Sequence, residues 1–129
     1  DIAVMADAKM GPGGLRVSQL VAAVDCGRVV NPIVLRQQIE GGLIFGLAAA
    51  VGATTDYRGG VARARTLGQL GLPTLAQSPE ISIEILESDR EPGGIGELAV
   101  PVVAPAIANA LFSATGNRIR RLPLSPAKL

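Results

Sequence analysis

Two runs in the second half of the chain carry its clearest structural signal: Glu80-Ile81-Ser82-Ile83-Glu84-Ile85-Leu86-Glu87 and Gly93-Gly94-Ile95-Gly96-Glu97. The first run alternates polar and apolar residues, which predicts a half-buried strand. Residues 89–96, rich in glycine, are expected to form a loop. The apolar residues 100–115, with prolines near their start and Gly116 after them, predict a helix. This half of the chain therefore reads as strand, glycine-rich loop and helix.

A further strand is expected earlier in the chain. Residues 15–24 end in an apolar, partly β-branched run, which predicts a buried strand that is broken at residues 25–28. The sequence Gly11-Pro12-Gly13-Gly14 before it is typical of a turn. Residues 1–8 show no decisive pattern and are ambiguous.

A helix is expected over residues 33–51. It starts at Asn31-Pro32, which suits an N-cap followed by the first helical position. Its apolar residues recur at helical spacing at Ile39, Leu43 and Leu47. Small residues four positions apart allow very close packing of the backbone against a neighbour, and the helix has three of them: Gly42, Gly46 and Ala50.

The remaining segments are expected to be irregular. Residues 54–64 suit a hairpin that turns at Gly59-Gly60, and residues 66–77 suit an extended loop over another surface. Residues 118–124 should form a short extended tail. We therefore expect one domain over residues 1–129 of the α/β (α+β) class, with a mixed sheet packed by two main helices.

Composition excludes several functions. There are 12 Lys and Arg against 11 Asp and Glu, and a net charge of +1 argues against a general nucleic-acid binder. The chain has no His and a single Cys, which rules out a Ser-His-Asp triad, an internal disulfide and a His-based zinc site, so no metal ligands are assigned. The longest apolar stretch is shorter than the roughly 20 residues of a membrane-spanning helix.

The composition also suggests that the chain is part of something larger. Hydrophobic residues make up 48% of it and the mean hydropathy is +0.38, but aromatic residues make up only 2%. A core with so few aromatic side chains should leave apolar patches uncovered. Since the chain also begins with Asp1 rather than Met, we expect a fragment, a processed product or a separately encoded piece of a larger enzyme.

Glu97 is the leading candidate for chemistry. A carboxylate that joins a glycine-rich loop to an apolar helix is costly to desolvate and needs a partner or a role. The competing interpretation is an acidic residue at a helix N-terminus. Residues 93–96 could likewise hold a phosphate through backbone N–H groups or simply form a tight turn, and Gln38 could face a ligand or solvent.

Four motifs are weak singly but specific in combination: Val24-Asp25-Cys26-Gly27-Arg28-Val29-Val30-Asn31-Pro32, Gln38-Ile39-Glu40-Gly41-Gly42, Gly93-Gly94-Ile95-Gly96-Glu97 and Thr115-Gly116-Asn117-Arg118-Ile119-Arg120-Arg121-Leu122-Pro123. Together they resemble the molybdenum hydroxylases, the family of xanthine dehydrogenase and aldehyde oxidase, and within it the isoquinoline 1-oxidoreductase β-subunit branch. The resemblance extends over nearly everything from about residue 15 onward.

The resemblance implies that residues 1–129 are the C-terminal segment of a molybdopterin-binding domain. The cofactor would be molybdopterin with molybdenum, in bacteria often as the cytosine dinucleotide. The partners implied are the remainder of the molybdenum subunit, which holds the other cofactor-binding loops, and an electron-transfer subunit with iron–sulfur clusters. The compartment, bacterial cytoplasm or periplasm, is left open.

The same resemblance assigns roles in the site. Glu97 would be the base that deprotonates the water-derived oxygen attacking an aldehyde or an N-heteroaromatic ring. Gln38 would hydrogen-bond the pterin, and Gly94, Ile95 and Gly96 would bring the loop close to the cofactor. Many relatives have proline after the glutamate where this chain has Leu98, which loosens the backbone there. Two alternatives remain: a non-catalytic assembly module that completes another subunit's fold, and an anion- or nucleotide-binding module.

Overall fold

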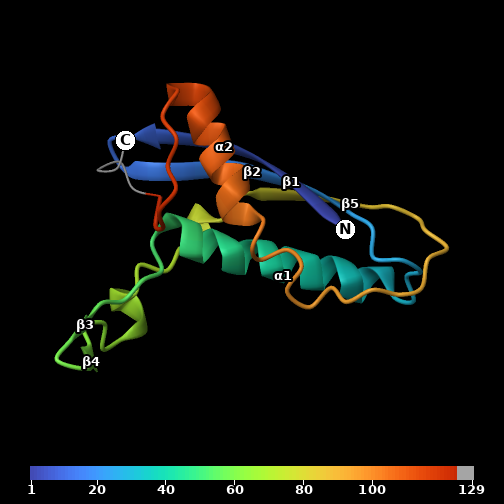
Figure 1. Cartoon of the computed structure of the whole chain (residues 1–129), viewed down its shortest axis with the longest axis horizontal. Helices are drawn as coiled ribbons and strands as arrows, with labels where there is room; N and C mark the ends of the chain where they lie inside the picture. The colour runs from blue at the N-terminus through green and yellow to red at the C-terminus, as the bar shows by residue number, and fades with distance from the viewer. Residues whose placement is uncertain (125–129) are drawn as a thin grey trace.

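The fold is a three-stranded mixed sheet with two helices, as the computed structural model of residues 1–124 shows (Figure 1). The strands lie in the order β1-β2-β5, with β2 in the centre. This arrangement confirms the expected α/β class, mixed sheet and two main helices. The main elements are β1 (Ile2–Gly11), β2 (Gly14–Val24), α1 (Pro32–Val51), β5 (Glu80–Ile85) and α2 (Val103–Thr115).

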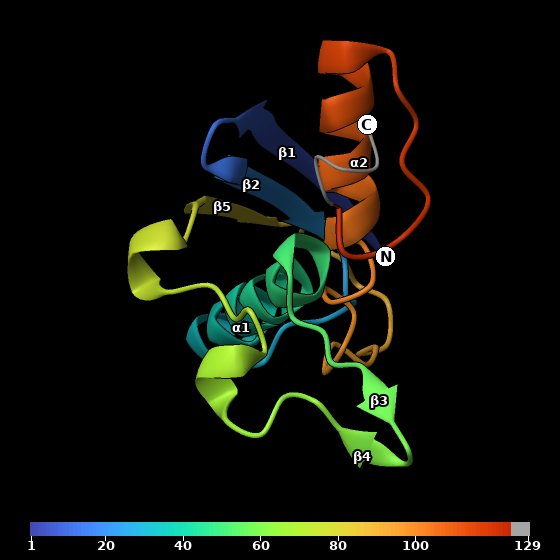
Figure 2. The same ribbon diagram turned by 90° about the vertical axis from the view of Figure 1, so that its left-hand side faces the viewer.

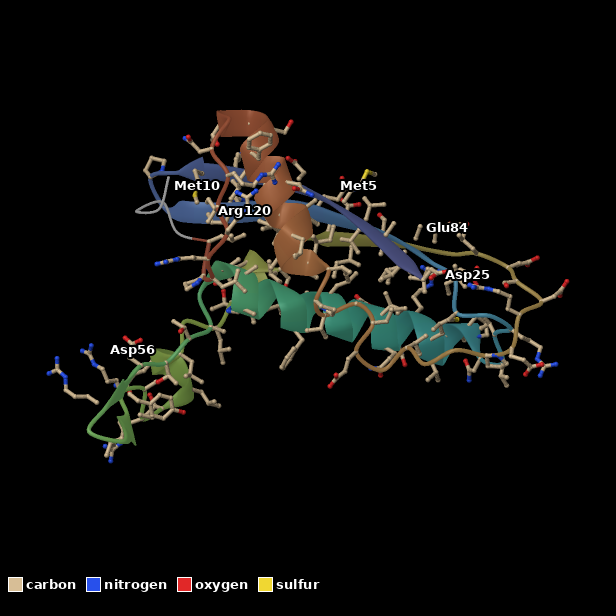
Figure 3. The ribbon with its side chains drawn as sticks, viewed as in Figure 1. Met5, Met10, Asp25, Asp56, Glu84 and Arg120 are labelled. Carbon is tan, nitrogen blue, oxygen red and sulfur yellow. The ribbon has the colours of Figure 1, made fainter. Side chains whose placement is uncertain are left out.

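The sheet has one covered and one open face. β1 runs antiparallel to β2, and β5 runs parallel to β2, with Leu20 opposite both Ala6 and Ile81. Alternate residues of all three strands point into the core beneath the sheet, where Leu20 is fully buried. Met5 and Glu84 lie on the face turned away from α1 (Figure 3). The half-buried strand expected at residues 80–87 is therefore confirmed as β5.

The ambiguous residues at the start of the chain form β1. Their pattern is weak because alanine and an exposed methionine take several of the positions. Pairing with β2 stabilises the strand despite its weak sequence pattern, because the backbone N–H and C=O groups of β1 that face β2 can form hydrogen bonds with it. The expected turn at Gly11-Pro12-Gly13-Gly14 connects the two strands.

Helix α1 follows its sequence signals closely. The Asn31 side chain accepts hydrogen bonds from the N–H groups of Ile33 and Val34, each at 3.1 Å, and Pro32 occupies the first position. The expected buried face is present, with Ile39 and Leu43 fully buried. On the same side, Gly42 faces Ala99, and Gly46 faces the residues that open α2. The close packing predicted from the small residues is confirmed.

A small hairpin and two turns of 3₁₀-helix lie between α1 and β5. The hairpin β3 (Tyr57–Arg58) and β4 (Val61–Ala62) projects from the body of the molecule (Figures 1 and 2), as residues 54–64 predicted. The two 3₁₀-helices, η1 (Leu67–Gln69) and η2 (Leu75–Gln77), replace part of the extended loop expected at residues 66–77. Each is a single turn closed by short-range hydrogen bonds. A turn this short has no repeating apolar pattern in its sequence, so it could not be predicted as a helix.

Helix α2 packs against β1 and α1 and leads into the tail. It begins at Val103, three residues later than expected, and ends at Gly116, whose φ of 74° is the left-handed conformation that glycine adopts readily. The tail returns to the end of α1, where the Leu124 N–H donates to the carbonyl of Ala50 at 2.8 Å. Neither α1 nor α2 is long and apolar enough to span a membrane, and no other helix of residues 1–124 is.

Candidate functional site

The loops that follow β2 and β5 are joined to one another. These two strands are parallel, so their carboxyl ends lie at the same edge of the sheet. There the Gly93 N–H donates to the carbonyl of Cys26 at 2.7 Å, and the Arg28 N–H donates to the carbonyl of Arg90 at 2.9 Å. The glycine-rich loop is thereby held by its first residue against the end of β2.

An ion pair strengthens this junction. The Arg90 guanidinium lies 2.6 Å from Asp25 Oδ2 and 3.2 Å from a carboxylate oxygen of Asp1. The other oxygen of Asp25 accepts the Gly27 N–H at 3.0 Å. The hydrogen bond from Arg90 and that from Gly27 hold the pKa of Asp25 below its usual value. Figure 3 shows Asp25 at this edge of the sheet, above the start of α1 in that view.

The three glycines of the loop have an unexpected backbone geometry. Glycine often marks a backbone position of positive φ, but Gly93, Gly94 and Gly96 do not adopt it. A methyl group on Gly94 or Gly96 would meet no atom within 4 Å in the described part of the chain. Neither torsion angles nor packing within residues 1–124 therefore requires these glycines. The backbone of Gly94 and Gly96 is thus open to the surroundings, with no side chain over it.

Gln38 is connected to this loop. It lies on the exposed side of α1, and its side-chain Nε2 donates to the carbonyl of Gly96 at 2.7 Å, across 58 positions of sequence. The Oε1 atom of the same amide has no hydrogen-bond partner among residues 1–124. The structure thus brings together two of the predicted site positions, and it leaves an acceptor of Gln38 available next to the loop.

Glu97 follows directly after this contact. Its side chain is exposed, with no hydrogen bond or ion pair to another described residue, and its carbonyl accepts the Val100 N–H at 3.1 Å. Because α2 begins only at Val103, Glu97 is not in the first turn of that helix. The alternative of a carboxylate that merely complements the helix N-terminus therefore does not apply here.

Apolar side chains on both sides of the carboxylate fix the position of the loop. Ile95 and Leu98 are half-buried and pack against the core, and Ala99 is buried beneath Gly42. Ile95, predicted as a cofactor contact, thus has part of its side chain in the core. The backbone at Glu97 is thus anchored by neighbouring residues that pack in the core, and the Glu97 side chain is exposed.

The backbone of the loop offers unused donors. The N–H groups of Gly94, Ile95, Gly96 and Glu97 bond to no acceptor in residues 1–124. These N–H groups, the amide of Gln38 and the carboxylate of Glu97 are all groups that can hydrogen-bond a polar ligand. Among the described residues no cluster of His, Cys, Asp and Glu could hold a metal ion.

Sequence reasoning missed two residues that position the site. The sequence predicts a strand break at Asp25 and places it in one of the family motifs, but it indicates no ion pair there and no role for Arg90. A carboxylate directly after a buried strand was the available signal, because it needs a cation or N–H donors when the strand end is partly buried. The identity of that cation, 65 positions away, has no local signature.

Residues 4–79 match the family described as the molybdopterin cofactor-binding domain. The chain is 37% identical to the membrane-bound aldehyde dehydrogenase [pyrroloquinoline-quinone] of Gluconacetobacter polyoxogenes over 115 residues. This match covers 89% of the chain and 15% of that protein. The chain is 34% identical over 113 residues, 88% of its length, to isoquinoline 1-oxidoreductase subunit beta of Brevundimonas diminuta, covering 14% of that protein. The chain thus spans about one seventh of the length of these relatives.

Solved structures show the same arrangement. Quinoline 2-oxidoreductase from Pseudomonas putida 86 superposes with a TM-score of 0.75 at 27% identity, over 88% of this chain and 16% of that one. Aldehyde oxidoreductase from Desulfovibrio gigas superposes with a TM-score of 0.74 at 30% identity, over 88% of this chain and 13% of that one. The sheet, both helices and the loops between them therefore form a recurring unit of much longer chains.

Proposed function

Since the chain belongs to the molybdopterin cofactor-binding domain family, we propose that it is the C-terminal segment of such a domain in a molybdenum-dependent oxidoreductase. The whole enzyme would hydroxylate an aldehyde or an N-heteroaromatic substrate with oxygen taken from water. The observation that carries this proposal is the 2.7 Å hydrogen bond from Gln38 Nε2 to the carbonyl of Gly96. It joins the candidate cofactor contact to the residue directly before the candidate base.

The residues present suit a molybdopterin. A pterin has ring nitrogens, an amino group and a carbonyl, so a protein site that binds it needs both hydrogen-bond donors and acceptors. Gln38 keeps one acceptor atom and one N–H free, and the backbone at Gly94, Ile95 and Gly96 provides donors. The absence of side chains at Gly94 and Gly96 lets a flat ligand reach this backbone.

Glu97 would move a proton in the proposed reaction. When bound, the cofactor would supply the two-electron redox centre at which the substrate carbon is oxidised. The Glu97 carboxylate would take the proton from the attacking water-derived oxygen, which is the role of a general base. The contact of Gln38 with Gly96 would fix the backbone from which this carboxylate projects. Glu97 would thus be catalytic, while Gln38 binds the cofactor and positions the loop.

Other polypeptide would complete the site. These relatives, of which the chain covers 14–15%, have ample further chain for the remaining cofactor-binding loops and pocket walls. Large apolar side chains are exposed on the described surface: Val30 is 89% exposed, Phe45 71% and Leu75 91%. Further polypeptide packed on this surface would bury them. We assign electron transfer to an iron–sulfur partner, because one cysteine is too few to hold a cluster.

Replacement of the base in the complete enzyme tests the proposal. Glu97→Gln keeps the size and hydrogen-bonding shape of the side chain but removes its basicity. We expect kcat to fall by about 10²–10⁴-fold with molybdenum and pterin content unchanged. Glu91→Gln, an exposed carboxylate of the same inter-element loop, should leave kcat unaltered. Normal turnover of the Glu97→Gln enzyme at full cofactor content would reject the catalytic role.

A non-catalytic assembly module is the first alternative. It is favoured by the exposed apolar side chains, which suit a chain that completes the fold of another subunit. It predicts that Glu97→Gln leaves turnover intact, whereas disruption of the apolar surface lowers the yield of assembled protein.

An anion- or nucleotide-binding module is the second alternative. The four free N–H groups at residues 94–97 favour it, since such groups hold phosphate in other loops. Calorimetry with a nucleoside diphosphate tests it on the whole chain. Binding that is lost in Gly94→Val but kept in Gly13→Val, in the turn between β1 and β2 where a side chain also meets no atom within 4 Å, would support it.

A further inference from the structure

The second helix and the tail enclose a groove that the proposed site does not use. It has a volume of about 640 Å³ and lies between one side of α2 and residues 118–124. Its apolar lining comes mainly from Pro101, Ala104, Pro105, Ala108, Ile119 and Leu122. We name it the arginine groove, because Arg118, Arg120 and Arg121 also line it.

The three arginines differ in their partners. Arg118 is engaged within the chain, with its guanidinium bonded to the Asn109 side chain and stacked 3.9 Å from the centre of the Phe112 ring. Arg120 and Arg121 are exposed and form no ion pair or side-chain hydrogen bond within residues 1–124. The lining contains no Asp or Glu. The groove therefore carries two uncompensated positive charges above an apolar floor.

The tail that carries these charges is fixed to the body. Ile119 and Leu124 are buried, at 5% and 3% exposure, on either side of the two arginines. The backbone bond from Leu124 to Ala50 ties the tail to the end of α1. Figure 3 shows Arg120 beside α2, where the tail runs alongside the helix. The guanidinium groups are thus presented from a defined backbone position.

We propose that the arginine groove seats a segment of the molybdenum subunit outside this chain, a segment with apolar side chains and at least one carboxylate. Charge complementarity requires the carboxylate, because Arg120 and Arg121 meet no acid of their own. The floor of proline, alanine, isoleucine and leucine requires the apolar side chains, which a free inorganic anion lacks. Since the chain spans about one seventh of its relatives, the same subunit has ample chain to supply this segment.

This inference rests on the proposed function for the identity of the subunit, and cross-linking of the complete protein tests it. Arg120→Lys and Arg121→Lys keep the positive charge and add an amine that a carbodiimide joins to a carboxylate in direct contact. We expect mass spectrometry to find each new lysine linked to an Asp or Glu of the same subunit, outside residues 1–129. The link should vanish when the protein is unfolded in guanidinium chloride before the reaction.

A charge reversal then checks that the contact matters. Arg120→Glu with Arg121→Glu should lower the recovery of assembled subunit about tenfold or more, because it places like charges together. Lysine in place of the identified acid should restore recovery. A link only to the iron–sulfur subunit, a link only within residues 1–129, or no link would each overturn the proposal. Molybdenum content of the unaltered protein is measured separately, and its absence would overturn the proposed function without affecting the cross-link.

Discussion

Gly42 in α1 and Ala99 in the turn after Glu97 lie in such close contact that a Cβ on Gly42 would come within 2.9 Å of the Ala99 Cβ. One turn further along the helix, Gly46 faces the carbonyl of Val100 and the side chain of Val103. The position of the candidate base thus depends on the absence of two side chains from the neighbouring helix. Packing, in addition to the hydrogen bond from Gln38, sets where the loop lies.

The first prediction concerns this contact. Gly46→Ala would place a methyl group against the backbone carbonyl of Val100, which cannot yield as a flexible side chain can. We expect the free energy of unfolding of the complete protein to fall by about 1–3 kcal/mol, as measured by urea titration. Gly41→Ala is the matched control, because a methyl group there meets nothing within 4 Å in the described residues. It should gain up to about 1 kcal/mol from helix propensity. Equal effects of the two variants would contradict the packing argument.

A second prediction concerns Gln38. Gln38→Ala removes the bond to Gly96, so we expect the loop at residues 93–97 to be cleaved faster by a protease and the molybdenum content to fall. Gln37→Ala changes the preceding residue, which is exposed and makes no side-chain hydrogen bond within residues 1–124. That variant should match the wild type in both measurements. Unchanged cleavage in Gln38→Ala would show that the bond does not restrain the loop.

A third prediction concerns pH. Arg90 and the Gly27 N–H lower the pKa of Asp25 in the folded state, whereas the unfolded value is about 3.9. The stability that this pair contributes is therefore present above about pH 4 and is lost as the pH falls through the lowered folded pKa. Asp25→Asn keeps the acceptor for Gly27 but removes the charge. It should be less stable at pH 7 and should lose less stability than the wild type on acidification.

Chemical denaturation at a series of pH values checks this sign. Asp89→Asn serves as the control, because the Asp89 side chain is exposed and makes no ion pair within the described chain. Its acid profile should follow that of the wild type. An Asp25→Asn profile parallel to the wild type at all pH values would mean that the Arg90 pair contributes no stability.

A fourth prediction concerns the start of α1. Asn31→Ala leaves the N–H groups of Ile33 and Val34 without their acceptor, so the free energy of unfolding should fall by about 1 kcal/mol. Asn31→Ser retains a capping oxygen and should recover most of that loss. Thermal unfolding of the two variants beside the wild type measures the difference. A fall as large in Asn31→Ser as in Asn31→Ala would argue against capping.

Local signals explain which parts of the fold could be predicted from sequence. Asn31-Pro32 marks the start of α1 through capping chemistry that involves only residues within one turn, and Gly116 marks the end of α2 in the same way. The start of α2 was placed three residues early, because prolines at 101 and 105 are compatible with the first turn of a helix or with the turns before it. β1 was left undecided because its pattern depends on the partner strand.

The site was harder to predict from sequence than the fold, because its contacts join residues that are far apart in the chain. Nothing near Gln38 indicates that its amide reaches Gly96, and nothing near Asp25 indicates Arg90. The resemblance to molybdenum hydroxylases singled out Gln38 and the loop together, while the residue pattern alone favoured a solvated helix face for Gln38. The roles of Glu97, Gln38, Gly94, Ile95 and Gly96 stay predictions, and the Glu97→Gln and Gln38→Ala variants test the first two.

The parallel alignment of β5 with β2, in which Ile85 lies opposite Val24, controls how far the glycine-rich loop extends beyond the sheet. Movement of β5 by two residues would keep every isoleucine facing inward but would displace the start of the loop by about 7 Å. The Gly93 N–H would then lose the Cys26 carbonyl, and Ala99 would no longer pack against Gly42. The position of the carboxylate thus depends on strand alignment, so a change within β5 that shifts its pairing with β2 should abolish activity even though it leaves residues 93–97 unaltered.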